Sequence, residues 1–245
     1  MSSDAIYSKQ FDRQRWNYLQ WGTGVVLRAL RAQVRPAVVF MRENGLHDTE
    51  TNLDNIIKER PIQDAYDRLY SKVGGDFAQS TFNRFQKAQK NQDDYIRAVN
   101  AWIALHGGDR IRDITTVSIS RTRLVLRRAI QDGLSIPKAA EMVIRENLAV
   151  GARRATVIAR TEIIAASNRG SLQGAMSTGL PMGKTWISFQ DGRTREDHVG
   201  VAPVETLTSL FVVGGEEMEF PGDWTHGASA ENIIQCRCTQ GYKVY

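Results

Sequence analysis

Apolar residues recur with a helical period along most of the first 150 positions. Between Phe11 and Glu43 they stand at Trp16, Leu19, Val26, Leu27, Leu30, Val34 and Val38. A period close to 3.6 places such side chains on one face of an α-helix. Pro36 is expected to kink or split this helix, because proline lacks an amide hydrogen and its ring clashes with the preceding turn. Gly45 is expected to end it.

Glycine and proline divide the residues that follow into further helices. We predict helical segments at residues 53–73, with a break before Pro61, and at 77–105, 110–133, 135–147 and 152–179. Gly74–Asp76 and Gly151 are predicted breaks, and Gly133 is a predicted C-terminal stop. Segment 77–105 is one long helix or two short ones. The β-branched residues 115–120 weaken the helical prediction locally, since branching at Cβ restricts χ1.

The pattern changes after Gly179. "GKTWISFQDG" predicts a short strand that runs into a turn at Asp191–Gly192. "LFVVGGEEMEF" predicts a hairpin about Gly214–Gly215, "SAENII" a short capped helix and "RCTQGYKVY" a final strand. The predicted class is therefore α+β. A predominantly helical region, residues 1–150, precedes a small mixed α+β domain, residues 151–245, with short antiparallel strands.

Composition is that of a soluble globular chain, with 42% hydrophobic and 24% charged residues. No apolar run approaches the roughly 18 residues of a membrane-spanning helix, so no membrane contact is expected. The first residues lack the apolar stretch of a secretory signal. Synthesis in a reducing cytoplasm is therefore expected.

Charge is distributed unevenly along the chain. Residues 110–160 contain 11 Lys and Arg against 4 Asp and Glu, whereas residues 186–245 contain 4 against 9. Arginine forms forked contacts with phosphate or carboxylate groups. Candidate contacts to an acidic protein or to duplex DNA are Arg121, Arg123, Arg127, Arg128, Arg153 and Arg154. The alternative is a solvated helix face that is rich in arginine.

The only two cysteines, Cys236 and Cys238, are separated by a single residue near the C-terminus. A disulfide between them would be strained. With His198 and His226 they form a candidate His₂Cys₂ zinc site, because thiolate and imidazole are the usual zinc ligands. The alternative is that both thiols are small buried side chains on one side of a final strand, with Arg237 facing the other way.

Motifs of common enzyme classes are absent, including a Walker loop, a dinucleotide fingerprint, a G-x-S-x-G elbow and an HExxH helix. His198 beside Asp191 or Asp197 could serve as a general base, but a turn followed by a short helix explains the same residues. We therefore do not expect an enzyme. The alternative is a metal-dependent nuclease or hydrolase that uses His198, His226 and the two cysteines.

Four segments, taken in order, are similar to the phage Mu F-like minor head protein family. They are "ARTEIIAASNRGSLQGA" from Ala159, "TWISFQDGRTREDHVG" from Thr185, "FPGDW" from Phe220 and "AENIIQCRC" from Ala230. The resemblance covers about residues 150–240. The residues that carry it are Thr161, Glu162, Asn168, Trp186, Asp191, Arg193, Arg195, His198, Pro221, Gly222, Asp223, Cys236, Arg237 and Cys238.

The resemblance implies a structural role in head morphogenesis. Such a protein would be a minor virion component that binds the portal protein, with the major capsid protein, a scaffold protein or packaged double-stranded DNA as further partners. It would be located in the head interior or at the portal vertex, and in the host cytoplasm during assembly. Residues 1–150 would dock to the portal or capsid. A third interpretation is a simple DNA-binding accessory protein.

The chain departs from the family pattern at two places. Val199–Gly200–Val201 stands where a Leu-x-Gly turn is expected, which affects the geometry of that loop. Some members have a cysteine pair where this chain has Arg195 and His198. That difference favours a metal-binding role for His198 with the C-terminal thiols.

Overall fold

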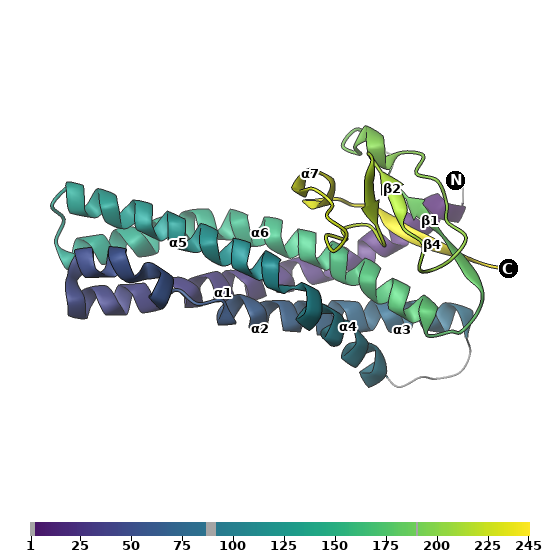
Figure 1. Ribbon diagram of the computed structural model, residues 1–245, viewed down its shortest axis with the longest axis horizontal. Helices are drawn as coiled ribbons and strands as arrows, with labels where there is room; N and C mark the ends of the chain where they lie inside the picture. Colours follow the sequence, from purple (N-terminus) through teal and green to yellow (C-terminus); the bar gives the residue numbers. More distant parts are fainter. Residues whose placement is uncertain (1–2, 87–91, 190) are drawn as a thin grey trace. The chain divides into compact units, whose positions relative to one another are not determined.

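The computed structural model of the chain describes residues 3–86, 92–189 and 191–245, and it confirms the α+β class. The helices are α1 (Ser3–Ile56), α2 (Arg60–Leu69), α3 (Gly75–Phe85), α4 (Gln92–His106), α5 (Gly108–Gln131), α6 (Ile136–Met176) and α7 (Ala230–Ile233) (Figure 1). Single turns of π-helix and 3₁₀-helix occur at Tyr70–Gly74 and Glu196–His198. The strands are β1 (Met182–Ile187), β2 (Phe211–Val213), β3 (Glu216–Met218) and β4 (Thr239–Val244).

Spatial contacts divide the chain into two compact units. The mixed unit combines Met1–Gly22, Asp67–Ala104 and Ala159–Tyr245, and the helical unit combines Thr23–Tyr66 and Leu105–Ile158. The predicted boundary at residue 150 does not coincide with this division, because both units take residues from the first 150 positions. The last segment of the mixed unit begins at Ala159, where the family resemblance also begins.

The helix is not split at Pro36, and the predicted break at Gly151 is wrong. Pro36 lies inside α1, and the non-helical residue of that helix is Gly45, with φ of 86°. Pro36 and Ala32 are exposed, so water can bond the Ala32 carbonyl that proline leaves without a donor. Gly151 lies inside α6, which is continuous through it. A glycine in a helix interior costs only about 1 kcal/mol relative to alanine, which packing along the rest of the helix can offset.

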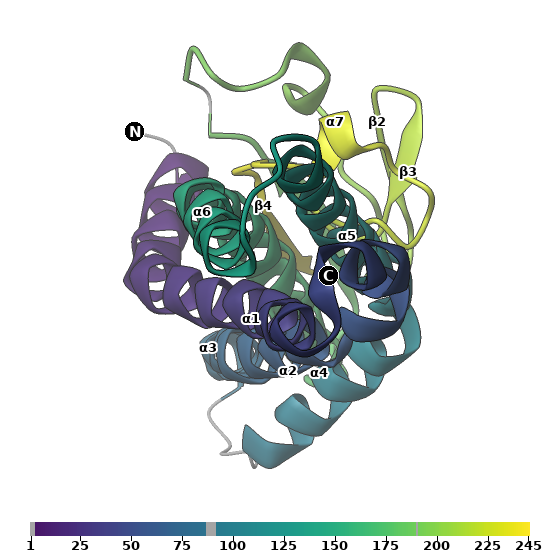
Figure 2. The ribbon, with the colours of Figure 1, turned by 90° about the vertical axis from the view of Figure 1, so that its left-hand side faces the viewer.

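An apolar core in the helical unit is shared by α1, α5 and α6. Its buried members are Val34, Ala37, Val38, Met41, Leu53, Ile57, Val125, Leu126, Ala129, Ala139, Ala140 and Val143. Figure 2 shows α1, α5 and α6 from a second direction. Buried Gln33 joins α1 to α5, since its side chain accepts a bond from Ser118 at 3.0 Å and donates to Thr115 at 2.9 Å.

In the mixed unit, small residues allow α6 to approach the π-turn and α3 closely. A Cβ atom added to Gly170 would lie 2.1 Å from the Gly74 carbonyl oxygen, and one added to Gly174 would lie 2.2 Å from that of Ala78. The predicted break at Gly74–Asp76 is therefore wrong. The glycines there continue the helix through a π-turn and let backbones meet.

The predicted strands and short helix of the mixed unit are confirmed. β1 pairs antiparallel with β4, from Met182 opposite Val244 to Ile187 opposite Thr239 (Figure 1). β2 and β3 form a hairpin whose turn residues, Gly214 and Gly215, have positive φ. Helix α7 follows Ser229, whose side chain accepts a bond from the Asn232 amide. The final strand, predicted to begin at Arg237, begins at Thr239, so both cysteines precede it.

Candidate metal centre

The residues described by the structure contain one group of three side chains arranged to hold a metal ion. His198 ends the 3₁₀ turn, whereas Cys236 and Cys238 lie in the extended segment between α7 and β4. His198 Nδ1 is 3.6 Å from Cys236 Sγ and 3.4 Å from Cys238 Sγ. The three ligand atoms lie within 4.8 Å of one another, and all three residues are buried.

These distances match the edges of a tetrahedral zinc site. Zinc bonds of about 2.3 Å to sulfur and about 2.0–2.1 Å to nitrogen, at a tetrahedral angle, separate the two ligand atoms by about 3.5 Å. Both His198–cysteine separations are within about 0.1 Å of this value. Both histidine–sulfur edges of such a site are therefore present.

Local backbone geometry presents the two thiols side by side. Gln235 has φ of 57°, which turns the chain after α7, and the Cys236 amide donates to the Ile233 carbonyl at 3.1 Å. The amide of Cys238 donates to Cys236 Sγ at 3.4 Å. An amide that points at sulfur favours the thiolate, which is the form that binds a metal.

A chain of hydrogen bonds orients the His198 ring. Asn232 Nδ2 donates to Glu216 Oε2 at 2.7 Å, so its carbonyl oxygen faces His198 Nε2 at 3.1 Å. Because that oxygen only accepts, Nε2 carries a proton, and Nδ1 is the ring nitrogen that faces the sulfurs. Metal-binding histidines are commonly oriented by a second partner in this way. The indole ring of Trp186 packs edge-on against the imidazole, 5.5 Å between centroids.

His198, Cys236 and Cys238 each shift the pKa of a neighbour in the cluster. The Cys238 hydrogen bond, and then the His198 bond, hold the pKa of Cys236 well below its usual value, although burial opposes them. The bond to Cys236 and burial raise the pKa of Cys238. Burial is the largest effect on His198 and lowers its pKa, but bonds to Cys236 and Asn232 together raise it above the ordinary value. An ion at this position would displace a shared proton.

The structure does not bring His226 to this cluster, so the predicted His₂Cys₂ set is corrected to His198, Cys236 and Cys238. His226 Nδ1 lies 2.7 Å from Asp223 Oδ2, and the His226 side chain is 35% exposed. Asp223 is fully buried and also accepts bonds from the Glu219 and Thr225 amides. The local carboxylate, three residues earlier, is the partner of His226.

Three residues that carry the family resemblance bond to residues 234–238. Thr161 Oγ1 accepts the Gln235 amide at 3.2 Å, and Arg195 donates to the Ile234 carbonyl at 2.8 Å. Arg237 pairs with Asp191 through both guanidinium nitrogens, and this bond holds the pKa of Asp191 well below its usual range. The Arg237 side chain, which is 10% exposed, is therefore neutralised by a carboxylate.

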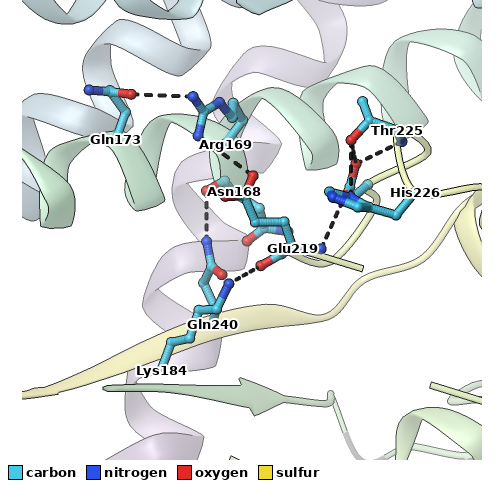
Figure 3. A network of polar contacts seen from close by, with 9 residues as sticks. Asn168, Arg169, Gln173, Lys184, Glu219, Thr225, His226 and Gln240 are labelled. Atoms are coloured by element: carbon cyan, nitrogen blue, oxygen red, sulfur yellow. Dashed lines mark hydrogen bonds and ion pairs between the residues drawn. The ribbon is translucent and has the colours of Figure 1, made fainter. Parts of the chain in front are cut away.

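Asn168 joins α6 to the other side of the same segment. Its amide nitrogen donates to the Pro221 carbonyl at 2.7 Å and to the Cys238 carbonyl at 3.2 Å. Its backbone carbonyl accepts Gln240 Nε2 at 2.8 Å, as Figure 3 shows. The same network contains buried Lys184, which donates to the Glu219 carbonyl. These contacts tie helix, turn and strand together in the core of the mixed unit.

The buried position of Arg15 in α1 was not predicted from the sequence. Its guanidinium donates to Asn168 Oδ1 at 2.8 Å, Ser167 Oγ at 2.7 Å and the Cys238 carbonyl at 3.2 Å. Arg15 and Cys238 are 223 positions apart. The one sequence feature that could have indicated this role is the position of Arg15 on the apolar face of the helix.

Other residues of the resemblance have local partners. Glu162 accepts the Tyr70 hydroxyl at 3.0 Å, and Trp186 is buried against Phe211. Arg193 is exposed and lies 3.5 Å from Asp191. These contacts are those of a folded core and its rim.

The predicted arginine contacts all lie in the helical unit, and several have acidic partners there. Arg123 pairs with Glu50 and Asp54, Arg127 pairs with Glu50 at 2.9 Å, and Arg128 lies 3.8 Å from Glu146. Arg154 donates to Ser118 at 3.0 Å and to the Ile114 carbonyl at 2.6 Å. Arg121 and Arg153 have no ion pair within the described residues.

No helix within the described ranges combines the length and the apolar character that crossing a membrane requires. Comparison of the chain with models of protein families, with curated proteins and with solved structures gives no match. The assignment of a function therefore depends on the residues themselves.

Proposed function

We propose that this chain is a structural protein of a tailed-phage head, a minor head or head-morphogenesis protein that binds the portal or the inner capsid. The observation that carries the proposal is the convergence of the family-like residues. Thr161, Asn168 and Arg195 bond to the segment that contains both cysteines, and Asp191 accepts bonds from Arg237 within it. Residues selected for a shared fold would be expected to meet in this way.

The proposal includes a bound zinc ion in the mixed unit. Two thiolates and an imidazole nitrogen are donors that bind zinc in preference to harder cations. When bound, zinc would accept electron pairs from His198, Cys236 and Cys238 and cross-link the loop at residue 198 to the C-terminal segment. Burial of the three residues, which are 1–3% exposed, supports a structural rather than a catalytic ion.

A metal-dependent nuclease or hydrolase is the second candidate, and the number of ligands favours it. Catalytic zinc sites commonly use three protein ligands and leave one position for water. Against it, the ligands are buried and the surrounding polar groups bond one another. Nuclease assays of the native chain and of His198→Ala separate the two functions. Activity that is lost with His198 while the fold persists would favour the hydrolase.

Partners would be the portal protein, with the major capsid protein, a scaffold protein or double-stranded DNA as further contacts. The helical unit supports a docking role, since it contains 16 Lys and Arg against 11 Asp and Glu, whereas the mixed unit is neutral with 16 against 16. The whole positive excess of the chain is thus in one unit. Such a field favours association with acidic surfaces.

Mass spectrometry of purified proheads and virions tests the proposal. We expect this chain as a low-copy component that remains after high-salt washing and that cross-links to the portal protein. Particles that lack the chain altogether, while the portal protein is readily detected in the same preparation, would refute a structural role.

A further inference from the structure

The helical unit contains a groove whose character matches neither a solvated face nor a simple phosphate-binding surface. A hollow of about 200 Å³ lies among α1, α5 and α6, and a second hollow of about 540 Å³ adjoins it between α1 and α6. The two share Arg31, Val34 and Asn147 as lining residues, so they are parts of one groove. Along α1 it extends from Leu27 to Arg42, a length of about 22 Å at 1.5 Å per residue.

Positive charge gathers on the groove without matching acids. The arginines that line it are Arg31, Arg35, Arg42, Arg121, Arg128 and Arg154. Glu146 is the single acidic residue among the described lining residues, and it lies 3.8 Å from Arg128. Arg31, Arg35, Arg42 and Arg121 form no ion pair with any described residue. These cations are therefore available to an anionic partner.

Two of the arginines repel one another inside the first hollow. Burial, and then the charge of Arg121, lower the pKa of Arg154 to about 10. A like-charged pair in a partly dehydrated site is unfavourable in the free protein. A bound carboxylate or phosphate would relieve that repulsion.

The groove also presents apolar side chains to water. Val39, Leu124 and Ile144 line it and are 46%, 54% and 45% exposed. An isolated exposed apolar residue needs no explanation, but a row of them flanked by arginines is typical of a surface that binds another protein. A DNA duplex would satisfy the arginines and leave these side chains uncovered.

We infer that this groove binds an acidic amphipathic helix of another protein, with apolar residues on the floor and carboxylates against the arginines. Its length accommodates about four turns of such a helix, and helix-in-groove recognition uses anchors at positions i, i+3, i+4 and i+7. Naming a head protein, such as the portal, as the source of that helix rests on the proposed function. The chemistry of the groove is independent of the proposed function.

Binding of a synthetic peptide tests the inference. The probe is a labelled helical peptide of about 16 residues, with leucines at i, i+3, i+4 and i+7 and with glutamates alternating with helix-favouring alanines elsewhere. Its matched comparator replaces every leucine by glutamine and retains the charge. Fluorescence anisotropy with the full chain should give about tenfold tighter binding of the leucine peptide, since only that peptide buries apolar area.

Variants of the chain locate the binding site. Arg31→Glu with Arg35→Glu should weaken binding about tenfold or more, because each reversal replaces attraction by repulsion. Ile144→Gln should weaken the leucine peptide and leave the glutamine peptide unchanged. Lys138→Glu is the control, as Lys138 is exposed on α6 and does not line the groove. Circular dichroism confirms that each variant is folded.

Three outcomes would overturn the inference. They are equal binding of the two peptides, binding unaffected by the Arg31 and Arg35 reversals, and duplex DNA bound more tightly than the leucine peptide through those arginines. The assay contains no phage particle, so its failure leaves the proposed head role intact if the chain is found in proheads. If the chain binds the peptide but is absent from proheads, the inference about the groove stands and the proposed head role is refuted.

Discussion

Removal of zinc should destabilise the mixed unit selectively. His198 and Cys238 are 40 residues apart, so an ion that both bind closes a loop of about that length. If a metal cross-link constrains the unfolded chain as a disulfide does, a 40-residue loop is worth about 4 kcal/mol. For a protein of this size, where 1 kcal/mol shifts Tm by roughly 2–4 °C, the expected loss is roughly 8–16 °C.

Tryptophan fluorescence offers an assay confined to the affected unit. All five tryptophans, at positions 16, 21, 102, 186 and 224, belong to the mixed unit. Thermal unfolding followed by this signal, with one equivalent of zinc and after chelation, measures the shift. Far-ultraviolet circular dichroism of the same samples follows the helices of both units.

Variants of the two histidines sharpen the test. His198→Ala should abolish both stoichiometric zinc binding and the shift in Tm on chelation. His226→Ala should retain both, since His226 bonds Asp223 outside the cluster. The reasoning is refuted if the purified chain binds no zinc, if chelation leaves Tm unchanged, or if the two variants lose zinc equally.

Three further predictions concern the packing and the polar core of the mixed unit. Gly170→Ala should lower stability by about 1–3 kcal/mol in urea unfolding, because its Cβ would lie 2.1 Å from the Gly74 carbonyl oxygen; Gly108→Ala, which meets nothing within 4 Å, should not lower it. Asn168→Leu should cost about 3 kcal/mol or more, because it removes the donor to the buried Pro221 carbonyl and the acceptor of Arg15 and Thr239, and an unchanged urea midpoint would contradict this. Burial lowers the pKa of Lys184 to about 8, so the unfolded chain binds more protons between that pH and the ordinary pKa of lysine, and stability should rise with pH across this window by up to ~3 kcal/mol. Lys184→Met should remove that rise, and a rise that persists in the variant would contradict the assignment.

The cysteine pair and its histidine illustrate how far sequence reasoning reaches. Residue chemistry alone selected Cys236, Cys238 and His198, because thiolate and imidazole are rare in this chain. The same argument selected His226 with equal force and was wrong. Which histidine meets the thiols is decided by the loop at residue 198 and by the Asp223 carboxylate, and neither follows from ligand type or spacing.

Glycine was the least reliable guide to the fold. Gly45 and Gly133 interrupt helices with positive φ, as predicted, and Gly214 and Gly215 form the predicted hairpin turn. Gly74 instead lets two helical backbones meet. The sequence is silent on this difference, because a break and a close approach both favour the residue that lacks a Cβ.

Long-range polar contacts could not be predicted at all. Arg15 bonds Cys238 across 223 positions, and no period or motif connects them. By contrast, the strands and the short capped helix after residue 180 were predicted well. Their signals are local: alternation, a glycine pair and a serine cap.

A cryo-electron microscopy map of the assembled prohead at its portal vertex tests the central claim most directly. The account predicts density for this chain at the portal or on the adjacent inner capsid, with the arginine-lined groove of the helical unit occupied by a helix of the neighbouring protein. A well-resolved portal vertex with no density for the chain, in particles shown to be assembled in its presence, would contradict the account.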